Sequence, residues 1–286
     1  MEGAQILIAG VGGLGCSWAS KAHLRVNADV DLVLIDADES SFELSKQAHV
    51  IKLGAESNAN GCAGLPPLGE QRMRNLSKAS MMLLKEVELV ILLLGLGGGT
   101  GTGAAPVVAE VAKQSGALTV GIVTKPFSFE GKRRMRQAEE GIARLAENVD
   151  TLIVIPNDRL KDVIAGAPLQ EAFRNADDVL RMGVKGISDI ITCPGLVNVD
   201  FADVRSVMTE AGTALLGIGI GSGRSRAIEA AQAAMNSPLL EAARIDGAKG
   251  CVINITGGKD MTLEDMTSAS EIIYDVVDQE ANIIVG

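Results

Sequence analysis

The amino-acid sequence predicts an α/β protein: a Rossmann-like domain with a parallel sheet, then a long central helix and a smaller α+β domain. Two observations lead to this prediction. Short, continuous runs of apolar and β-branched residues alternate with helix-like stretches over the first half of the chain, and a long segment with helical spacing follows. Such alternation is typical of a parallel sheet covered by helices on both faces. Ligands of these sheets bind where the carboxyl ends of the strands meet.

Five apolar runs predict the strands of this sheet. They cover residues 6–9, 32–35, 89–94, 119–123 and 152–155. Each run is continuous rather than alternating, as expected for a strand that is buried on both faces. We expect the domain that they build to extend over residues 1–167.

The central helix is predicted for residues 168–191, where apolar side chains recur at helical spacing. The sequence Cys193-Pro-Gly195 is a stop signal for that helix. The helix and the loop after it connect the two domains over residues 168–199.

The second domain is expected over residues 200–286. Its predicted helices and strands are shorter than those of the first domain. The helices are expected at residues 201–210, 225–235 and 262–277, and the strands at residues 214–220, 250–255 and 281–285.

Composition narrows the class of function. The 286 residues include 26 basic and 36 acidic side chains, a net charge of −10 that argues against nucleic acid as a partner. Cys16, Cys62, Cys193 and Cys251 show no CxxC spacing and are interpreted as thiols of a reducing compartment. The two histidines form no metal-ligand pattern. No apolar run reaches the roughly 20 residues of a membrane span, so we expect a cytoplasmic protein without direct membrane insertion.

The most informative motif is the glycine loop Gly97-Gly-Gly-Thr-Gly-Thr-Gly103, which follows a predicted strand and precedes a predicted helix. Missing side chains at five of these seven positions let consecutive backbone N–H groups converge at a helix N-terminus, where the helix dipole favours an anion. The hydroxyls of Thr100 and Thr102 add donors. A flexible turn behind a buried strand is the simpler alternative, but it does not account for so many glycines. We therefore expect a phosphate-binding loop, although it is not a Walker motif.

A second glycine loop, Gly10-Val-Gly-Gly-Leu-Gly15, lies between the first predicted strand and a helix, and Asp36 and Asp38 follow at the end of the next strand. Taken alone, this pattern indicates a dinucleotide-binding site. It also fits an adenylating enzyme that activates a carboxy-terminal glycine. Neither kind of enzyme needs a second glycine loop near residue 100.

The glycine-loop register and three later segments together resemble the FtsZ family of tubulin-like cell-division GTPases. The segments are residues 124–135 (TKPFSFEGKRRM), 155–160 (IPNDRL) and 197–204 (VNVDFADV), in the order of the family. The resemblance implies binding of GTP and GDP with Mg²⁺, head-to-tail assembly of copies of this chain into filaments, and other division proteins as further partners.

The resemblance also implies roles for particular residues. Those assigned to the phosphates are Gly12, Gly13, Gly97, Gly98, Gly99, Thr100, Gly101 and Thr102. Glu130 and Arg134 are four residues apart, so one helical face presents a carboxylate to the ribose and a guanidinium to phosphate. A surface ion pair explains these two residues nearly as well.

Guanine selectivity requires an acceptor for both N1–H and the 2-amino group of the base, and a carboxylate supplies one. Asp177 matches the base-reading position of the family, with Phe173 stacking on the ring and Asn157 contacting sugar or base. The alternative interpretations are core packing for Phe173 and a solvated helix face for Asp177.

The segment containing Asn198, Asp200 and Asp203 is implied to be catalytic. Any one of these residues is first an N-cap by its local pattern. In the family this loop acts on the nucleotide of the adjacent subunit, where its acids polarise the attacking water. The site would be divided between two molecules, and hydrolysis would require a heterologous contact that does not close.

The chain also departs from the family pattern. Cys16-Ser17 replaces asparagines near the base, Ile35-Asp-Ala-Asp38 lacks the usual Asn-Thr-Asp, and residues 61–67 are a loose match to a glycine-rich turn. The chain stops at Gly286, where family members continue with further strands and a tail peptide. We therefore expect a shortened second domain with an unpaired sheet edge and no tethering through a tail.

The leading hypothesis is an FtsZ-like GTPase that hydrolyses GTP at subunit junctions, in cell division or a related cytoskeletal task. The alternative is a tail-less paralogue that binds nucleotide and regulates or co-assembles with another division protein, with little turnover. A dinucleotide-dependent or adenylating enzyme built on residues 10–15 is the third hypothesis.

Overall fold

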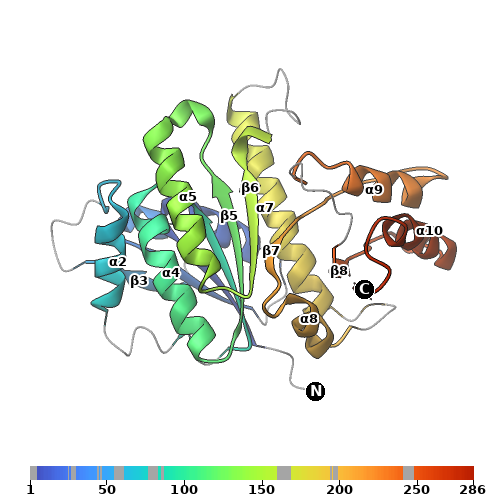
Figure 1. The fold of residues 1–286 in the computed structure, drawn as a ribbon, viewed down its shortest axis with the longest axis horizontal. Coiled ribbons are helices and arrows are strands. Elements are labelled where there is room, and N and C mark those ends of the chain that lie inside the picture. Colours follow the sequence, from blue (N-terminus) through green and yellow to red (C-terminus); the bar gives the residue numbers. More distant parts are fainter. Residues whose placement is uncertain are drawn as a thin grey trace.

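The structure is a computed structural model of the chain (Figure 1). It describes residues 5–24, 26, 30–43, 45, 47–54, 61–76, 83–84, 87–159, 169–193, 195, 199–240 and 248–286. Within the long helix that starts at Leu169, side chains are described from Asp177 onward.

A seven-stranded sheet in the order β3-β2-β1-β4-β5-β6-β7 organises the first half of the molecule, and every neighbouring pair is parallel. Its strands are β1 (Ile6–Val11), β2 (Val30–Asp36), β3 (His49–Lys52), β4 (Leu89–Gly95), β5 (Leu118–Lys125), β6 (Thr151–Pro156) and β7 (Gly212–Ala214). The five strands expected from apolar runs are confirmed. Strand β3, a short edge strand with polar side chains at both ends, was not predicted from the sequence.

Helices cover both faces of this sheet. The helices α2 (Pro66–Arg74), α4 (Gly99–Gln114) and α5 (Lys132–Ala146) lie on one face, which faces the viewer in Figure 1. The helices α1 (Gly12–His23) and α7 (Leu169–Thr192) lie on the other. Alternate residues of each strand serve the two cores, since Leu7 packs toward α4 whereas Ile6 and Ile8 pack toward α1.

The expected central helix is confirmed as α7, whose 24 residues span about 36 Å at 1.5 Å per residue. Its start lies near the carboxyl end of β6 and its end lies near α8 (Phe201–Met208) (Figure 1). Two hydrogen bonds place α8 at the amino edge of the sheet: Arg205 donates to the carbonyl of Gly116, before β5, and Thr151, the first residue of β6, donates to the carbonyl of Met208 at 2.6 Å. The helix α7 therefore joins opposite edges of the sheet.

The smaller unit contains α9 (Arg226–Met235), β8 (Gly250–Ile253), α10 (Leu263–Tyr274) and β9 (Asn282–Val285). The strands β8 and β9 pair in parallel as a separate two-stranded sheet. No helix in the described ranges combines the length and the apolar character required to cross a bilayer.

The strand expected at residues 214–220 is wrong in extent and position. The observed strand, β7, ends at Ala214 and pairs with β6 of the large sheet, although we expected it in the second domain. The alternation of glycine with apolar residues after Ala214 has another cause. A Cβ atom on Gly219 would lie 1.9 Å from the carbonyl oxygen of Ala230, so the missing side chain lets this extended segment pack directly on α9.

Candidate functional site

Two glycine loops meet at the carboxyl edge of the sheet. The first connects β1 to α1, and α1 begins at Gly12; the second connects β4 to α4, which begins at Gly99. The N-cap positions of these helices, Val11 and Gly98, provide no side-chain hydrogen bond to the first turn. The free N–H groups of two helix N-termini therefore point into the same region, which suits an anion.

The glycines of these loops differ in what surrounds them. A Cβ atom on Gly12, where φ is +75°, would lie 2.9 Å from the amide nitrogen of Gly101, so the two loops touch there. Gly97, with φ of +96°, faces the backbone of Arg134 in the same way. A Cβ atom on Gly98 would meet nothing within 4 Å. Gly98 thus borders open space, whereas Gly12 and Gly97 allow close packing.

The two threonines of the second loop also differ. Thr102 is buried, and its Oγ1 accepts a hydrogen bond of 2.8 Å from the amide of Gly97. This bond closes the loop across five residues. Thr100 is buried as well and lies next to Gly12. The structure therefore indicates that Thr102 shapes the loop, and the ligand contact that the sequence suggested for it stays a prediction.

A buried carboxylate borders the first loop. Asp36, at the end of β2, is 3% exposed, and it accepts hydrogen bonds from the amide of Ala37 at 2.7 Å and from the Ser41 hydroxyl at 2.6 Å. A Cβ atom on Gly13 would lie 3.7 Å from its Oδ2. Within the described part of the chain, no Lys or Arg forms an ion pair with Asp36.

The charge of Asp36 affects its neighbour Cys16. Burial, reinforced by the carboxylate of Asp36, raises the pKa of the Cys16 thiol to about 12. Its Sγ lies 3.5 Å from the carbonyl oxygen of Gly10 and 3.7 Å from that of Ile35. Cys16 therefore fills the space between the first loop and β2 as a neutral thiol.

Glu130 and Arg134 lie beside the second loop. Glu130 ends the short 3-10 helix η2 (Ser128–Glu130), and Arg134 is in the first turn of α5. Arg134 donates to Oε2 of Glu130, while the amide of Phe127 donates to Oε1 at 2.9 Å. The surface ion pair is therefore present, and it is placed against Gly97 through the backbone of Arg134.

Asn157 follows β6 at the same edge of the sheet, two strands and roughly 10 Å from β4. It is 8% exposed, and its Oδ1 atom accepts no hydrogen bond from the described residues. Buried polar atoms are normally paired, because an unpaired one costs about 1–3 kcal/mol. A polar ligand at this position would provide the missing donor.

Asp177, on α7, contacts α1. Its Oδ1 accepts from the indole Nε1 of Trp18 and its Oδ2 from Nζ of Lys21, both at 2.5 Å. The carboxylate of Asp177 is 25% exposed and both of its oxygens accept hydrogen bonds, so this helix face is only partly solvated. Phe173 lies one turn earlier in α7, but its side chain is outside the described residues.

The expected catalytic acids lie far from the glycine loops. Asp200 is the N-cap of α8, and with Asp203 it forms a capping box in which the amide of Ala202 donates to Asp200 and the amide of Asp200 donates to Asp203. Because α8 lies at the amino edge of the sheet, the length of α7 separates these acids from the loops of the same molecule. Asn198 falls outside the described residues.

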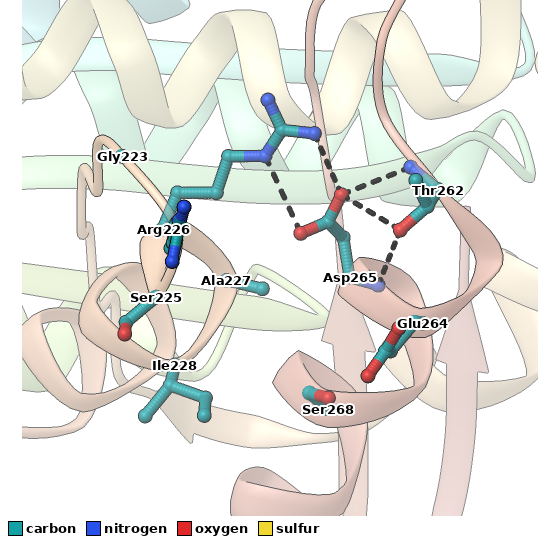
Figure 2. A pocket seen from close by; sticks show the side chains of 10 residues that line it. Gly223, Ser225, Arg226, Ala227, Ile228, Thr262, Glu264, Asp265 and Ser268 are labelled. Carbon is teal, nitrogen blue, oxygen red and sulfur yellow. Dashed lines mark hydrogen bonds and ion pairs between the residues drawn. The ribbon is translucent and has the colours of Figure 1, made fainter.

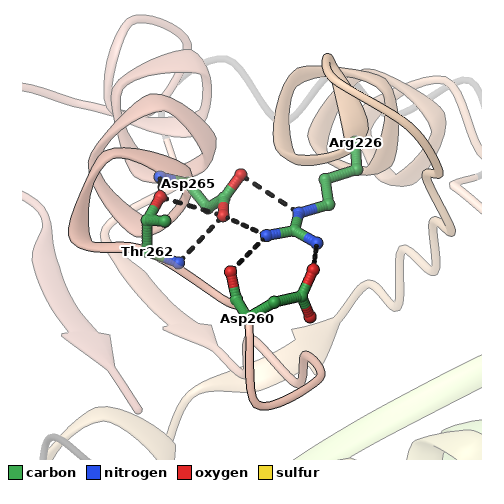
Figure 3. Close-up of polar contacts among 4 residues, drawn as sticks. All are labelled: Arg226, Asp260, Thr262 and Asp265. Carbon is green, nitrogen blue, oxygen red and sulfur yellow. Dashed lines mark hydrogen bonds and ion pairs between the residues drawn. The ribbon is translucent and has the colours of Figure 1, made fainter.

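A second polar cluster lies between the amino ends of α9 and α10 (Figure 2). A pocket opens at this cluster, and Arg226 is one of the residues that line it. Arg226 donates to both carboxylate oxygens of Asp265 and to the carboxylate and carbonyl of Asp260 (Figure 3). Thr262 and Asp265 form the capping box of α10. Each guanidinium nitrogen already has an acceptor, so the cluster ties α9 to α10 and leaves no free fork for an anion.

Sequence reasoning missed Trp18 and Lys21. The signal available for Trp18 was its place as the single tryptophan, on the helix that follows the first glycine loop. Its N–H needs a partner when buried, but no local pattern identifies that partner.

Known protein families and solved structures match most of this chain. Residues 5–165 match the model of the Tubulin/FtsZ family GTPase domain, and residues 212–286 match that of the FtsZ family C-terminal domain. Among solved structures, an empty FtsZ dimer from M. jannaschii is 41% identical, with a TM-score of 0.94 over 99% of this chain and 82% of that one. The GTPγS-bound protofilament of CetZ2 from Haloferax volcanii is 21% identical, with a TM-score of 0.80 over 99% and 88%, and shows the fold alone.

Proposed function

The chain belongs to the FtsZ family of tubulin-like GTPases, and from this premise we propose that it binds GTP at the two glycine loops, hydrolyses it at the junction of two molecules, and serves cell division or a related cytoskeletal task. The observation that supports the proposal most directly is the meeting of two uncapped helix N-termini, α1 and α4, beside the open face of Gly98. Backbone amides arranged in this way suit a polyphosphate.

The residues around the loops fit the other parts of the nucleotide. Arg134 contacts the second loop through its backbone at Gly97, and its guanidinium pairs with Glu130. The unpaired Oδ1 of Asn157 supplies an acceptor for a sugar or base N–H or O–H group. Asp177 supplies two carboxylate oxygens for guanine, whose N1–H and 2-amino group both donate.

The buried carboxylate of Asp36 fits a divalent cation. A charge this buried is usually paired or coordinates a metal, and Mg²⁺ is commonly held by one or two carboxylates together with substrate phosphates. Asp36 would hold the cation directly or through water, next to Gly13. The cation would neutralise negative charge on the phosphates during hydrolysis.

Hydrolysis is assigned to Asp200 and Asp203 of a neighbouring molecule. Both carboxylates are exposed at the amino edge of the sheet, and a helix of about 36 Å separates them from the glycine loops of their own chain. When one molecule stacks on the next, its amino edge faces the neighbour's loops. The acids would orient water toward the terminal phosphate, so turnover would depend on assembly.

Complementation between two inactive variants tests this division of the site. Asp200→Asn removes an acid and keeps the glycine loops, whereas Gly98→Ala alters a loop and keeps the acids. We expect each variant alone to show little GTP turnover and an equimolar mixture to regain a substantial part of it, with turnover rising more steeply than protein concentration. A mixture that stays inactive would contradict a site shared in this way.

The departures at Cys16 and Asp36 favour a second candidate, a paralogue that binds nucleotide and co-assembles with another division protein. The carboxylate of Asp36 adds negative charge beside the first phosphate loop, where the family has asparagine. Tight GTP binding with turnover that stays negligible at every protein concentration would support this candidate. Preference for NAD or ATP over GTP would contradict both.

A further inference from the structure

The carboxylate of Asp177 is held by two side chains from a single helix. Trp18 and Lys21 are one turn apart on α1, and each donates to a different oxygen of Asp177 at 2.5 Å. The contact joins residues that are 159 and 156 positions apart in the sequence. It therefore fixes where α7 lies on α1, and it fixes the plane of the carboxylate.

The three side chains differ in solvent exposure, from the buried Trp18 to the half-exposed Lys21. Trp18 is 6% exposed within the core that α1 and α7 share, so its N–H points at Asp177 from the protein side. Lys21 is about half exposed, with a side-chain exposure of 49%, and Asp177 keeps 25%. A buried indole cannot rotate to another acceptor without repacking the core, and this makes the contact rigid.

The acceptor capacity of the carboxylate leaves room for a base. An ionised carboxylate offers about four lone-pair sites. The indole N–H and one ammonium N–H use one site on each oxygen, so one site on each oxygen remains. Guanine needs one acceptor for N1–H and one for its 2-amino group.

Opposite charges reinforce the contact between Lys21 and Asp177, whose Nζ and Oδ2 atoms lie 2.5 Å apart. The indole N–H adds a donor without adding charge. Together they orient the Asp177 carboxylate before any nucleotide arrives, which lowers the cost of ordering it on binding.

We propose that Trp18 and Lys21 are positioning residues that orient the Asp177 carboxylate and thereby set the selectivity of this chain for guanine over other purines. The inference rests on the proposed function, in which Asp177 reads the base. Trp18 and Lys21 would affect discrimination between bases, and they would do so only through Asp177.

The test compares nucleotides that differ at the 2-position of the base. Equilibrium binding of GTP and ITP is measured at protein concentrations below assembly, for wild type, Trp18→Phe and Lys21→Met. ITP lacks the 2-amino group, so wild type is expected to prefer GTP by about tenfold or more. Each variant should lower this GTP-to-ITP affinity ratio by about threefold or more. Without both donors the Asp177 carboxylate is less well oriented, so its hydrogen bond with the 2-amino group of guanine is weaker.

Two controls separate a positioning role from a purely structural one. Trp18→Phe keeps an aromatic ring in the core, and its thermal midpoint shows whether the fold is intact. Lys185→Met removes a matched ion pair with Asp189, further along the same helix α7, and should leave the ratio unchanged. Loss of GTP and ITP affinity by the same factor in Trp18→Phe and Lys21→Met, with an unchanged ratio, would overturn the proposal.

Asp177→Asn distinguishes failure of this inference from failure of the proposed function. An amide in place of the carboxylate donates to the 2-carbonyl of xanthine, so this variant should bind XTP better and GTP worse. If Asp177→Asn shows this change and the GTP-to-ITP affinity ratio is unaffected in Trp18→Phe and Lys21→Met, then Asp177 reads the base without Trp18 and Lys21, and the inference fails while the proposed function stands. If base preference does not change in Asp177→Asn, the base-reading role fails, and the positioning role with it. Tighter GTP binding by Trp18→Phe would also overturn the inference, since it would mean that the indole competes with the base.

Discussion

Gly12 and Gly101 face each other where the two glycine loops meet: a Cβ atom on Gly12 would lie 2.9 Å from the amide nitrogen of Gly101. This contact brings the N-termini of α1 and α4 together. The position of Gly98, beside the same region, is open. The difference between packed and open glycines separates those that the fold needs from those that a ligand needs.

Gly98→Ala should weaken nucleotide binding without affecting the fold. The backbone of Gly98 is extended, with φ of −89° and ψ of 173°, and a Cβ atom there meets no protein atom within 4 Å. We expect GTP affinity to fall by about tenfold or more, because a methyl group would keep phosphate from the amides. Gly186→Ala is the matched control, since Gly186 also has open space around it but lies within α7. Unchanged affinity in Gly98→Ala would show that no phosphate approaches this face.

Gly15→Ala should destabilise the fold. A Cβ atom on Gly15 would lie 2.2 Å from the carbonyl oxygen of Leu93, so α1 would have to move away from β4. Overpacking of this kind typically costs about 1–3 kcal/mol. Urea unfolding followed by circular dichroism measures the loss. A midpoint equal to that of wild type would mean that α1 is not packed on β4 as described.

Asp200→Asn and Asp200→Ala should differ in stability and agree in activity. Asparagine remains a good N-cap for α8, whereas alanine removes the cap and costs about 1 kcal/mol. Both variants lack the carboxylate, so both should lose most GTP turnover while GTP binding persists. Turnover is followed by phosphate release, and stability by thermal unfolding. Full activity in Asp200→Asn would restrict Asp200 to its capping role.

The contact between Arg226 and Asp265 should make the smaller unit sensitive to acid. The hydrogen bonds from Arg226 are the main cause of the pKa of Asp265 lying well below its usual value. A lowered carboxyl pKa in the folded state gives stability that is present above the ordinary value of about 3.9 and is lost as pH falls below it. Hydrogen exchange of α9 and α10 at pH 6 and pH 3 measures this. At pH 6 the amide protection factors of α9 and α10, which correct for the intrinsic pH dependence of exchange, should be lower in Asp265→Asn than in wild type. Wild type should lose more of its protection between pH 6 and pH 3 than Asp265→Asn; an equal loss would contradict the assignment.

Cys16 should resist alkylation in the folded protein. Its thiol is buried, and its pKa is raised to about 12, so almost no thiolate exists at pH 8. Cys193 is exposed at the end of α7. Iodoacetamide at pH 8, followed by peptide mass spectrometry, should modify Cys193 well before Cys16, and unfolding in urea should remove the difference. Rapid modification of Cys16 in the folded state would contradict its burial.

Much of the fold was predictable because its signals are local in the sequence. A continuous apolar run such as residues 89–94 predicts a strand that is buried on both faces. The central helix was predicted from the helical spacing of its own apolar residues. The edge strands β3 and β7 were missed or misplaced because each is short and pairs on one side only. The segment after Ala214 was misinterpreted because its glycines serve contact with α9, which produces the same alternation as a half-buried strand.

The site was predictable to the extent that backbone chemistry defines it. Glycine loops before helices favour phosphate, so Gly12 and Gly98 could be proposed as phosphate-binding residues without tertiary information. The contact of Trp18 with Asp177 depends on how α1 and α7 pack, and no spacing within either helix encodes it. The roles expected for all the site residues stay predictions, and the side chains of Phe173 and Asn198 also lie outside the described residues.

The length of α7 has a consequence for how a row of these molecules would grow. The amide cradle and the exposed acids lie at opposite edges of the sheet, so every junction of the proposed row would join unlike surfaces and the row would have a direction. At one tip the last cradle has no neighbour to supply acids, and its nucleotide would stay intact until another subunit arrives. At the opposite tip a pair of acids faces solvent. Addition and loss of subunits would therefore proceed at different rates at the two tips.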